Sequence, residues 1–560
     1  MALSRRELLI GSVGLATVGC TSSEDAAQRV DPNGTADAQT GSPDAAVSDE
    51  QTDTSSTTEP ELQLVDAPEY DGGFPFQLGV ASGDPDSASM VLWTRLIATP
   101  DPSLDLMVAV DLAIDENFDE LVSSTLTTAS AAYAHSVHQT PEGLDSDTWY
   151  HYRFRIGEHT SQTGRTRTLP APGNDAPTLR FGFSSCQNWE SGAYAAHRHL
   201  AAEDLDLFVW LGDYIYEYGP GNSGDVSSAG QRVHDSPEVT TLDGYRQRYA
   251  LYKSDPFLQA HHAARPWVVT WDDHEVDNNH ATNATEDGQD MDAFMLRREA
   301  AYQAWWENMP VRVPPPVSGE DFIIYRSFEW GDLVHLHMLD GRQFRSPQVT
   351  DGDPVALPGL GNLGVRLLSD NSRNPEQSML GSVQRQWLEA QVQSSTATWN
   401  VLGNQVYMHG LNAFPGEVPA INTDTWDGYF GERQGLLETI GGTDANLVVL
   451  SGDFHSSSAG DVRSDPFDPS GAVMATEFMA PAISSTFPEA LRGLAPLVLA
   501  VNPQVRNFSP ENGFMTCEVQ AETWTTRLHT LTDVTDENSP IAITATFTVD
   551  AGSAGVASIS

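Results

Sequence analysis

The sequence predicts a small all-β domain followed by a larger α/β domain. Between residues 76 and 169, short strand-like runs alternate with turns rich in Gly and Pro, a pattern typical of a β-sandwich. Beyond residue 175, apolar runs of strand length alternate with helix-length segments, which indicates an α/β domain. The chain has 560 residues, enough for two or three domains with full hydrophobic cores.

The all-β domain is expected over residues 70–169. Strand-like runs lie at 89–94, 107–112 and 149–154, and turn signals flank them. This pattern predicts a small immunoglobulin- or fibronectin-like sandwich. The segment holds no cluster of Asp, His or Cys with ligand-like spacing. We therefore expect it to pack against, or to position, the rest of the chain.

The α/β domain is expected over residues 176–535, after a linker rich in Pro and Gly at 170–175 and before a C-terminal extension at 536–560. Apolar runs predict strands at 179–183, 207–211, 267–270, 333–339, 399–402 and 447–450. Helix-length segments predict helices at 193–202, 242–252, 292–308 and 383–393.

The chain is strongly acidic, with a formal net charge of −49 from 78 acidic and 29 basic residues. This charge excludes nucleic-acid binding through basic patches, because such binding needs Lys and Arg to neutralise phosphates. Two interpretations of the acid excess stay open. It indicates either a soluble, self-repelling surface or a protein from a salty habitat, where ions screen the repulsion.

The first twenty residues read as an export signal. Arg5-Arg6 form a twin-arginine pair, and the apolar stretch that follows, 8–19, is too short to span a bilayer. Residues 17–20 resemble a lipoprotein cleavage box, so a lipid anchor at Cys20 is expected; the alternative is cleavage elsewhere and a freely soluble product. Residues 21–69 are acidic and nearly free of large apolar residues, which predicts a disordered linker.

Cysteine usage excludes a disulfide framework. Besides Cys20, the sequence has Cys186 and Cys517. Cys517 lies in a strand-like stretch and is interpreted as a core residue. Cys186 directly follows the first predicted strand of the α/β domain, and alone it would be a small buried apolar residue.

Polar side chains follow four predicted strands of the α/β domain at the point where each strand ends. These groups are Ser184-Ser185-Cys186, Gly212-Asp213 with Tyr216, Asp272-Asp273-His274-Glu275, and Gly452-Asp453-Phe454-His455. Each has a plain alternative: Asp213 and Asp453 could stabilise turns, and Tyr216 could be core packing. Because loops at the carboxyl ends of such strands meet in one crevice, the four together predict a metal site.

The order of these motifs resembles the calcineurin-type metallophosphoesterases, and their departures resemble the alkaline phosphatase D (PhoD) branch. The element Gly212-Asp213…Tyr216 matches the usual pattern, whereas Asp273, Asp453 and Cys186 replace its Asn, its His and part of its first motif. The segments 76–95, 339–345 and 426–429 also resemble this branch. The resemblance covers about residues 70–530 and implies an αββα sandwich for the α/β domain.

The resemblance also implies Fe(III) with Ca(II) nearby. Carried over residue by residue, Cys186, Asp213 and Tyr216 would hold iron, and Asp213 would bridge toward calcium. The remaining ligands would be Asp272, Asp273, Asn279, Asp453 and His455. Phenolate and thiolate suit trivalent iron, and carboxylate and amide oxygens suit calcium. Which of Asp272 and Asp273 binds directly, and how Asp453 and His455 divide between the metals, stays open.

The implied activity is hydrolysis of phosphate esters by a metal-bound hydroxide. Asp213 and His274 would be the catalytic residues: His274 would protonate the leaving group or hydrogen-bond the phosphate, with orientation of Asp273 as the alternative. Arg342 and Arg345 could grip phosphate or form structural ion pairs. Two other functions stay open: a phospholipase D-like phosphodiesterase, and a surface-binding lipoprotein without catalysis.

The expected setting is outside the cytoplasm. Export by the twin-arginine route would deliver the folded chain to the periplasm, to an outer-membrane anchor or to the medium. Small-molecule phosphate esters or phospholipid head groups are the expected substrates, and we expect a monomer.

Overall fold

The computed structural model describes residues 62–173, 176, 178–221, 232–285, 288–356, 364–414, 416–442, 446–493 and 495–560. The predicted export signal, Cys20 and the linker up to residue 61 lie outside these residues. In the described part of the chain, no helix has the length and apolar character needed to span a bilayer.

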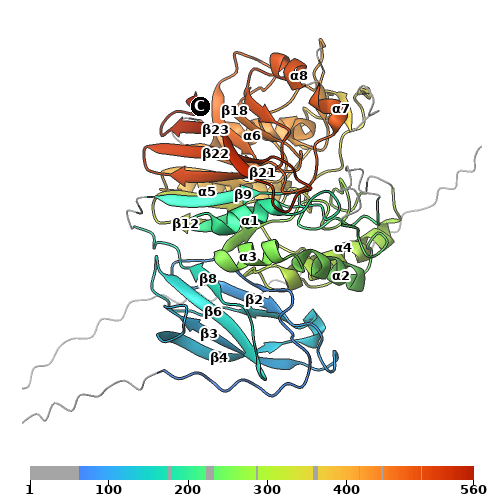
Figure 1. Cartoon of the computed structure of the whole chain (residues 1–560). Helices are drawn as coiled ribbons and strands as arrows, with labels where there is room; N and C mark the ends of the chain where they lie inside the picture. Colours follow the sequence, from blue (N-terminus) through green and yellow to red (C-terminus); the bar gives the residue numbers. More distant parts are fainter. Residues whose placement is uncertain are drawn as a thin grey trace, which may run out of the picture. The chain divides into compact units, whose positions relative to one another are not determined.

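A ten-stranded sheet forms one layer of the α/β domain and continues into the N-terminal domain (Figure 1). Its strands are, in spatial order, β24 (Ser558–Ile559), β23 (Ile541–Asp550), β22 (Thr523–Leu531), β21 (Gly513–Val519), β9 (Leu179–Ser184), β10 (Leu207–Trp210), β11 (Trp267–Val269), β1 (Val80–Gly83), β2 (Val91–Arg95) and β5 (Ser136–Gln139). The central strands β9, β10 and β11 are parallel and fully buried apart from one position, as expected for a sheet covered on both faces.

A seven-stranded sheet forms the other layer. Its strands are β12 (Arg326–Trp330), β13 (Val334–Met338), β15 (Trp399–Gly403), β17 (Leu447–Ser451), β19 (Val473–Met479), β18 (Ser457–Arg463) and β20 (Val505–Ser509). An apolar core between the two sheets joins Phe181 and Val209 of the first to Leu336 and Val448 of the second.

Helices cover the outer faces of both sheets. α1 (Ala195–Ala202), α2 (Leu242–Lys253), α3 (Pro256–Ala264) and α4 (Met291–Asn308) share a core with β10 and β11. α5 (Gly381–Ser394) and α6 (Phe430–Ile440) pack with β15 and β17. The order helix, sheet, sheet, helix confirms the predicted αββα sandwich.

Local sequence explains where three of these helices begin. The Thr241, Asp255 and Asp290 side chains accept hydrogen bonds from backbone N–H groups in the first turns of α2, α3 and α4. Such caps satisfy donors that a helix leaves free at its start. Pro256 occupies the first turn of α3, where its missing N–H group costs nothing.

The N-terminal domain is all-β, as predicted. β4 (Leu121–Ala129), β3 (Leu106–Ala113), β6 (Trp149–Ile156) and β7 (His159–Thr160) form one sheet, and β8 (Gly164–Arg167) pairs with β6. Alternate residues of β6 are buried, and they pack against β1, β2 and β5. β1 also pairs in parallel with β11 through Gly83 and Trp267, so this half of the sandwich continues into the α/β domain.

Two segments differ from expectation. Residues 536–560, expected as an extension, supply β23 and β24 to the ten-stranded sheet, because the buried side chains of β23 alternate and its backbone pairs along the whole of β22. At the end of the predicted disordered linker, the backbone of Val65 makes two hydrogen bonds. Its N–H group donates to the Ser124 hydroxyl, and its carbonyl accepts from the Arg155 guanidinium.

Candidate metal centre

The four predicted motifs meet at the edge of the sandwich where the carboxyl ends of parallel strands from both sheets lie. Cys186 follows β9, Asp213 follows β10, and Asp272 follows β11, all in the ten-stranded sheet. Asp453 and His455 follow β17 of the seven-stranded sheet. The centre is therefore assembled from both halves of the sandwich, as expected of a crevice at parallel strand ends.

The backbone at the centre is strained. Five predicted ligands have left-handed φ angles: Cys186 (57°), Asp213 (58°), Asn279 (53°), Asp453 (66°) and His455 (52°). This region is disfavoured for residues other than Gly, at about 1–3 kcal/mol each, and it is retained mainly at functional sites. Here it turns the chain sharply after a strand, so that the side chain projects into the centre.

Two glycines allow the motifs to approach each other. A Cβ atom on Gly212, whose φ is 111°, would lie 2.4 Å from Asp272 Cβ. A Cβ atom on Gly452 would lie 2.4 Å from Ser185 Oγ. The missing side chains thus bring the loop after β10 against the loop after β11, and the loop after β17 against the loop after β9.

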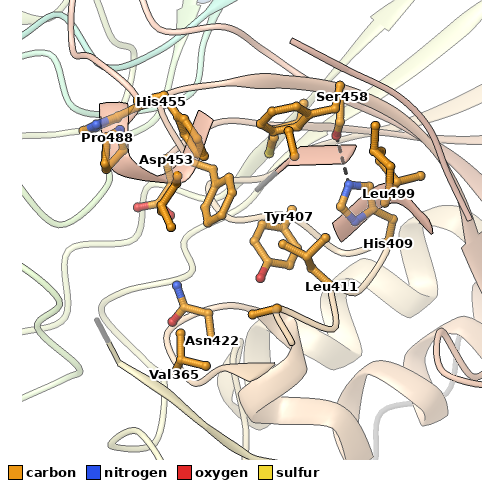
Figure 2. Close-up of a pocket in the computed structure, with 18 residues that line it drawn as sticks. Val365, Tyr407, His409, Leu411, Asn422, Asp453, His455, Ser458, Pro488 and Leu499 are labelled. Carbon is orange, nitrogen blue, oxygen red and sulfur yellow. Dashed lines mark hydrogen bonds between the residues drawn. The ribbon is translucent and has the colours of Figure 1, made fainter. Parts of the chain in front are cut away.

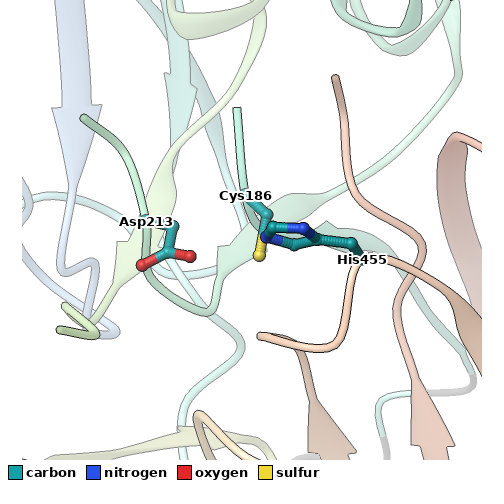
Figure 3. A group of neighbouring side chains, drawn as sticks. All are labelled: Cys186, Asp213 and His455. Atoms are coloured by element: carbon teal, nitrogen blue, oxygen red, sulfur yellow. The ribbon is translucent and has the colours of Figure 1, made fainter. Parts of the chain in front are cut away.

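The first group of ligand atoms joins Cys186, Asp213 and His455, which lie within 4.8 Å of one another (Figure 3). Tyr216 completes this group: its hydroxyl donates to Asp213 Oδ2 at 3.0 Å and lies 3.1 Å from His455 Nε2. The Ser485 hydroxyl donates to the Tyr216 oxygen at 2.7 Å. Four predicted ligands from three strand ends therefore share one place.

The second group joins Asp272, Asp273 and Asp453, also within 4.8 Å. The buried Arg342 guanidinium contacts all three carboxylates, closest through its hydrogen bond to Asp272 Oδ1. It also binds Asp424 Oδ2 at 2.8 Å. Arg342 therefore forms ion pairs with protein carboxylates in this structure. This matches the structural ion pair predicted for it as the alternative to phosphate binding.

A third group links the other two: Asp213, Asp273 and His274. His274 Nδ1 donates to Glu217 Oε2 at 2.8 Å, and its ring stacks on Tyr216 at 4.2 Å. Asp213 belongs to the first and third groups and Asp273 to the second and third, so these two carboxylates link neighbouring groups. That Asp213 bridges two metals stays a prediction.

Asn279 and Arg345 lie beside these groups. The backbone N–H group of Asn279 donates to Asp273 Oδ2 at 2.7 Å. Arg345 donates to the Asn279 carbonyl and forms an ion pair with Asp424 Oδ1 at 2.6 Å. Asn279 thus reaches the centre through its backbone, and metal binding by its side chain stays a prediction.

The electrostatics of the centre favour bound cations. Burial raises the pKa of Asp213 and Asp453 well above the usual range, and it raises the pKa of Asp272 to about 7 against the pull of Arg342. Burial and nearby Asp213 raise the pKa of the Cys186 thiol. Against the effect of burial, the charges of Arg342 and His274 hold the pKa of Asp273 below its usual range. Crowded buried carboxylates of this kind are costly until a cation compensates them.

The residues present fit metal ions. Asp213 Oδ1 and Asp272 Oδ2 are buried and have no hydrogen-bond partner among the described residues. Buried acceptors seldom stay unpaired in native proteins. Carboxylates, a thiol, a phenol and an imidazole all converge here, and each is a recognised metal ligand. That these particular side chains bind metal stays a prediction.

Sequence reasoning missed several supporting residues. Glu275 accepts from the backbone N–H groups of Asp213, Tyr214 and Asp272, which ties the second motif to the third. Because Glu275 lies inside the third motif, its place at the centre could have been predicted from the sequence. Glu217 directly follows Tyr216, but its partner His274 is distant in sequence. Ser485 had no signal in the sequence.

Comparison with known proteins identifies the family. A family model described as PhoD-like phosphatase matches residues 181–528, more than half of the chain. A second, described as PhoD-like phosphatase, N-terminal domain, matches residues 63–170. The chain belongs to the PhoD-like phosphatase family. The predicted resemblance is thereby confirmed.

Two relatives of this PhoD-family chain agree. Alkaline phosphatase D of Bacillus subtilis (strain 168) is 41% identical over 502 residues, which cover 88% of this chain and 84% of that protein. A solved structure described as PhoD is 39% identical, with a TM-score of 0.81, and the match covers 88% of this chain and 93% of that one. The chain is a phosphoesterase of the alkaline phosphatase D type, a hydrolase, which sets aside the non-catalytic lipoprotein.

Proposed function

We propose that this chain hydrolyses phosphate esters at a centre that holds Fe(III) beside Ca(II), and that it does so outside the cytoplasm. Family membership makes the chain a phosphoesterase. The observation that carries the metal assignment is the joining of Cys186, Tyr216 and His455 to Asp213. A thiol and a phenol beside one carboxylate suit trivalent iron, whereas the all-carboxylate group of Asp272, Asp273 and Asp453 suits calcium.

The residues divide the work as follows. When bound, the metals would neutralise charge on the phosphoryl oxygens and lower the pKa of a coordinated water. Asp213 would hold both ions. Arg342 keeps the three carboxylates of the second group in place through its ion pairs. His274 is held by Glu217 and lies beside Asp213 and Asp273, which supports its proposed role of giving a proton to the departing alcohol oxygen.

Elemental analysis joined to visible spectroscopy tests the metal assignment. Purified protein should contain iron and calcium and should be coloured, because tyrosinate bound to Fe(III) absorbs visible light. Tyr216→Phe should lose the colour. Tyr218→Phe, at a nearby tyrosine outside the first group, should keep it. Active but colourless wild-type protein would remove iron and Tyr216 from the proposal.

Export supports an extracytoplasmic role. The proposed location outside the cytoplasm rests on the twin-arginine pair, the short apolar stretch and Cys20. Fractionation of cells that express the chain should place activity outside the cytoplasm, and replacing Arg5-Arg6 by Lys-Lys should retain it inside. Cys20→Ser should convert an anchored enzyme into a soluble one; a soluble wild-type enzyme would contradict the lipid anchor.

A further inference from the structure

A pocket of about 270 Å³ opens beside the metal centre (Figure 2). Asp453 and His455 line it, and both also belong to the groups of metal-ligand atoms. The pocket is therefore continuous with the place where a phosphoryl group would be held. Whatever fills it is attached to, or lies directly beside, the reacting phosphate.

Aromatic side chains form one continuous wall of this pocket. The Tyr407 ring packs on Phe454 at 5.3 Å, Phe454 on Phe487 at 5.9 Å, and Phe487 on Phe508 at 5.5 Å. Leu411, Met479, Leu491, Leu499 and Val505 add further apolar surface. The first and third contacts are edge-to-face and the second is tilted. Ring packing at these distances is favourable and gives the wall a defined shape.

Few polar groups in the pocket are uncommitted. His409 Nε2 and Ser458 Oγ bind each other at 2.9 Å, and Asn422 Oδ1 accepts from the Asp424 N–H group. The Tyr407 hydroxyl is buried and has no hydrogen-bond partner among the described residues. A polyhydroxylated alcohol would leave most of its hydroxyls unpaired here, which is costly, whereas an apolar alcohol would not.

We propose that the pocket binds an apolar alcohol portion of the substrate, an aromatic or alkyl group esterified to the phosphate held at the metal centre. The proposal rests on the proposed function and names its substrate class. An apolar cavity of about 150 Å³ accommodates benzene, so this larger pocket takes a ring or a medium alkyl chain. The Tyr407 hydroxyl is a donor available to an ester oxygen. Hydrolysis would join a water oxygen to phosphorus, break the phosphorus–alcohol bond, and return a proton to the alcohol.

Two sources would supply this chemistry: soluble aryl or alkyl phosphates, and phospholipids with acyl chains. Both place hydrocarbon next to phosphate. Dihexanoylphosphatidylcholine below its micelle concentration represents the second source without a membrane surface. Faster turnover of this lipid than of soluble esters would assign the pocket to lipids, and the reverse would assign it to soluble esters.

The test compares cyclohexyl phosphate with myo-inositol 1-phosphate on the metal-loaded enzyme. Both alcohols are six-membered rings, but one is apolar and the other carries five further hydroxyls. Inositol is the more acidic alcohol, so leaving-group chemistry alone favours its ester. We expect kcat/KM to be at least about tenfold higher for cyclohexyl phosphate, which corresponds to about 1.4 kcal/mol.

Variants of Leu411 check that this pocket is the cause. Leu411→Trp fills the pocket. It should raise KM for cyclohexyl phosphate and so remove the preference for this ester. Leu411→Asn makes the wall polar and should also lower the ratio. Leu126→Trp, on the exposed face of the N-terminal domain, should leave the ratio unchanged. An unchanged ratio in both Leu411 variants would overturn the assignment.

Other outcomes separate this inference from the proposed function. Equal kcat/KM for the two esters, or a preference for inositol, would overturn the apolar pocket and leave the phosphoesterase intact. Hydrolysis of neither ester, with binding of cyclohexylphosphonate by calorimetry that Leu411→Trp abolishes, would overturn the reaction and support the pocket.

Discussion

His274 Nδ1 and Glu217 Oε2 form a buried hydrogen bond of 2.8 Å, although 57 residues separate them in the chain. Glu217 Oε1 also accepts from the backbone N–H group of Asn278 at 3.0 Å. The carboxylate therefore fixes the orientation of the imidazole from one side while Tyr216 stacks on its face. The two roles considered for His274, as the acid for the leaving group or as an orienter of Asp273, predict different effects when this hydrogen bond is weakened.

Glu217→Gln should lower activity in a way that depends on the leaving group. If His274 protonates the departing oxygen, kcat for alkyl phosphates should fall about 10²-fold, because general acid catalysis contributes at least that much. 4-Nitrophenyl phosphate should be affected far less, since nitrophenolate leaves without a proton. Metal content should stay unchanged, and Glu238→Gln, at a half-exposed position, serves as the control. Equal losses with both esters, together with lost metal, would instead make His274 a positioning residue for Asp273.

Gly212→Ala should damage the centre through geometry alone. The new Cβ atom would lie 2.4 Å from Asp272 Cβ, and a φ of 111° is unfavourable for Ala. We expect a loss of stability of at least about 1–2 kcal/mol and a fall in kcat/KM of about 10²-fold. Gly143→Ala separates the two causes, because Gly143 has a φ of 72° but no atom near its Cβ position. The checks are kcat/KM and the melting temperature of each variant. Near-normal kcat/KM and stability in Gly212→Ala would contradict the close approach of the two loops.

Removal of metal should destabilise the wild-type chain. It should also reverse which of wild type and Asp453→Asn is the more stable. Without a cation, burial and the neighbouring Asp272 make a charged Asp453 unfavourable. The chelated variant should therefore melt above chelated wild type, whereas the metal-loaded variant should melt below metal-loaded wild type. Calorimetry of all four samples measures the crossover. Parallel shifts in both states would remove Asp453 from the ligand set.

Lys253 should destabilise the fold at neutral pH. It is 1% exposed, its Nζ has no hydrogen-bond partner among the described residues, and it lies 4.2 Å from the Trp93 ring centroid. Burial, assisted by the charge of Arg95, lowers the pKa of Lys253 well below its usual range. Between the lowered pKa of Lys253 in the folded chain and pH about 10.4, the unfolded chain binds one more proton than the folded chain, so stability rises with pH across that window.

Lys253→Met should thus be more stable than wild type near pH 7, by at least about 1.4 kcal/mol, the free energy of one unit of pKa difference between the folded and unfolded chains. The difference should shrink as pH rises toward about 10.4. Lys253→Arg should be less stable, because guanidinium stays charged. Denaturant unfolding at pH 7 and pH 10 measures both, and a constant difference would contradict a neutral Lys253.

Salt should decide between the two interpretations of the acid excess. With a net charge of −49, the folded chain repels itself, and NaCl screens that repulsion within a Debye length of about 3 Å at 1 M. If the chain is built for a salty habitat, its melting temperature should rise steadily between 0.1 and 2 M NaCl. A melting temperature that is flat over this range would favour an ordinary soluble surface.

Much of the centre could be predicted because parallel strand ends converge. Cys186, Asp213 and Asp453 each follow a short apolar run, and such runs predict buried strands from sequence alone. A structural ion pair was one predicted role of Arg342, but its partners could not be predicted, because they are carboxylates of three separate segments. Asp424 was missed for the same reason: it contacts Arg342 and Arg345 only in the folded chain.

The fold was predicted least well where pattern and context disagree. α3 carries buried His261 and His262 beside alanines, which gives it a weak apolar stripe, and no helix was predicted there. β23 carries a readable strand pattern, because Ala545, Phe547 and Val549 alternate with more exposed residues, yet the segment was not predicted to join the sheet. Which segments pair is a tertiary property that composition does not encode.

The parallel pair between Gly83 and Trp267 has a practical consequence for anyone who shortens this protein. β1 pairs with β11 and is followed in the sheet by β2 and β5, and Trp93 Nε1 of β2 donates to the Glu307 carbonyl of α4. A truncation that begins after residue 170 would remove β1 and leave the backbone of Trp267 without its partner at the edge of an apolar strand. Such an edge invites pairing with another copy, so the shortened enzyme would be prone to aggregate even though every metal ligand is retained.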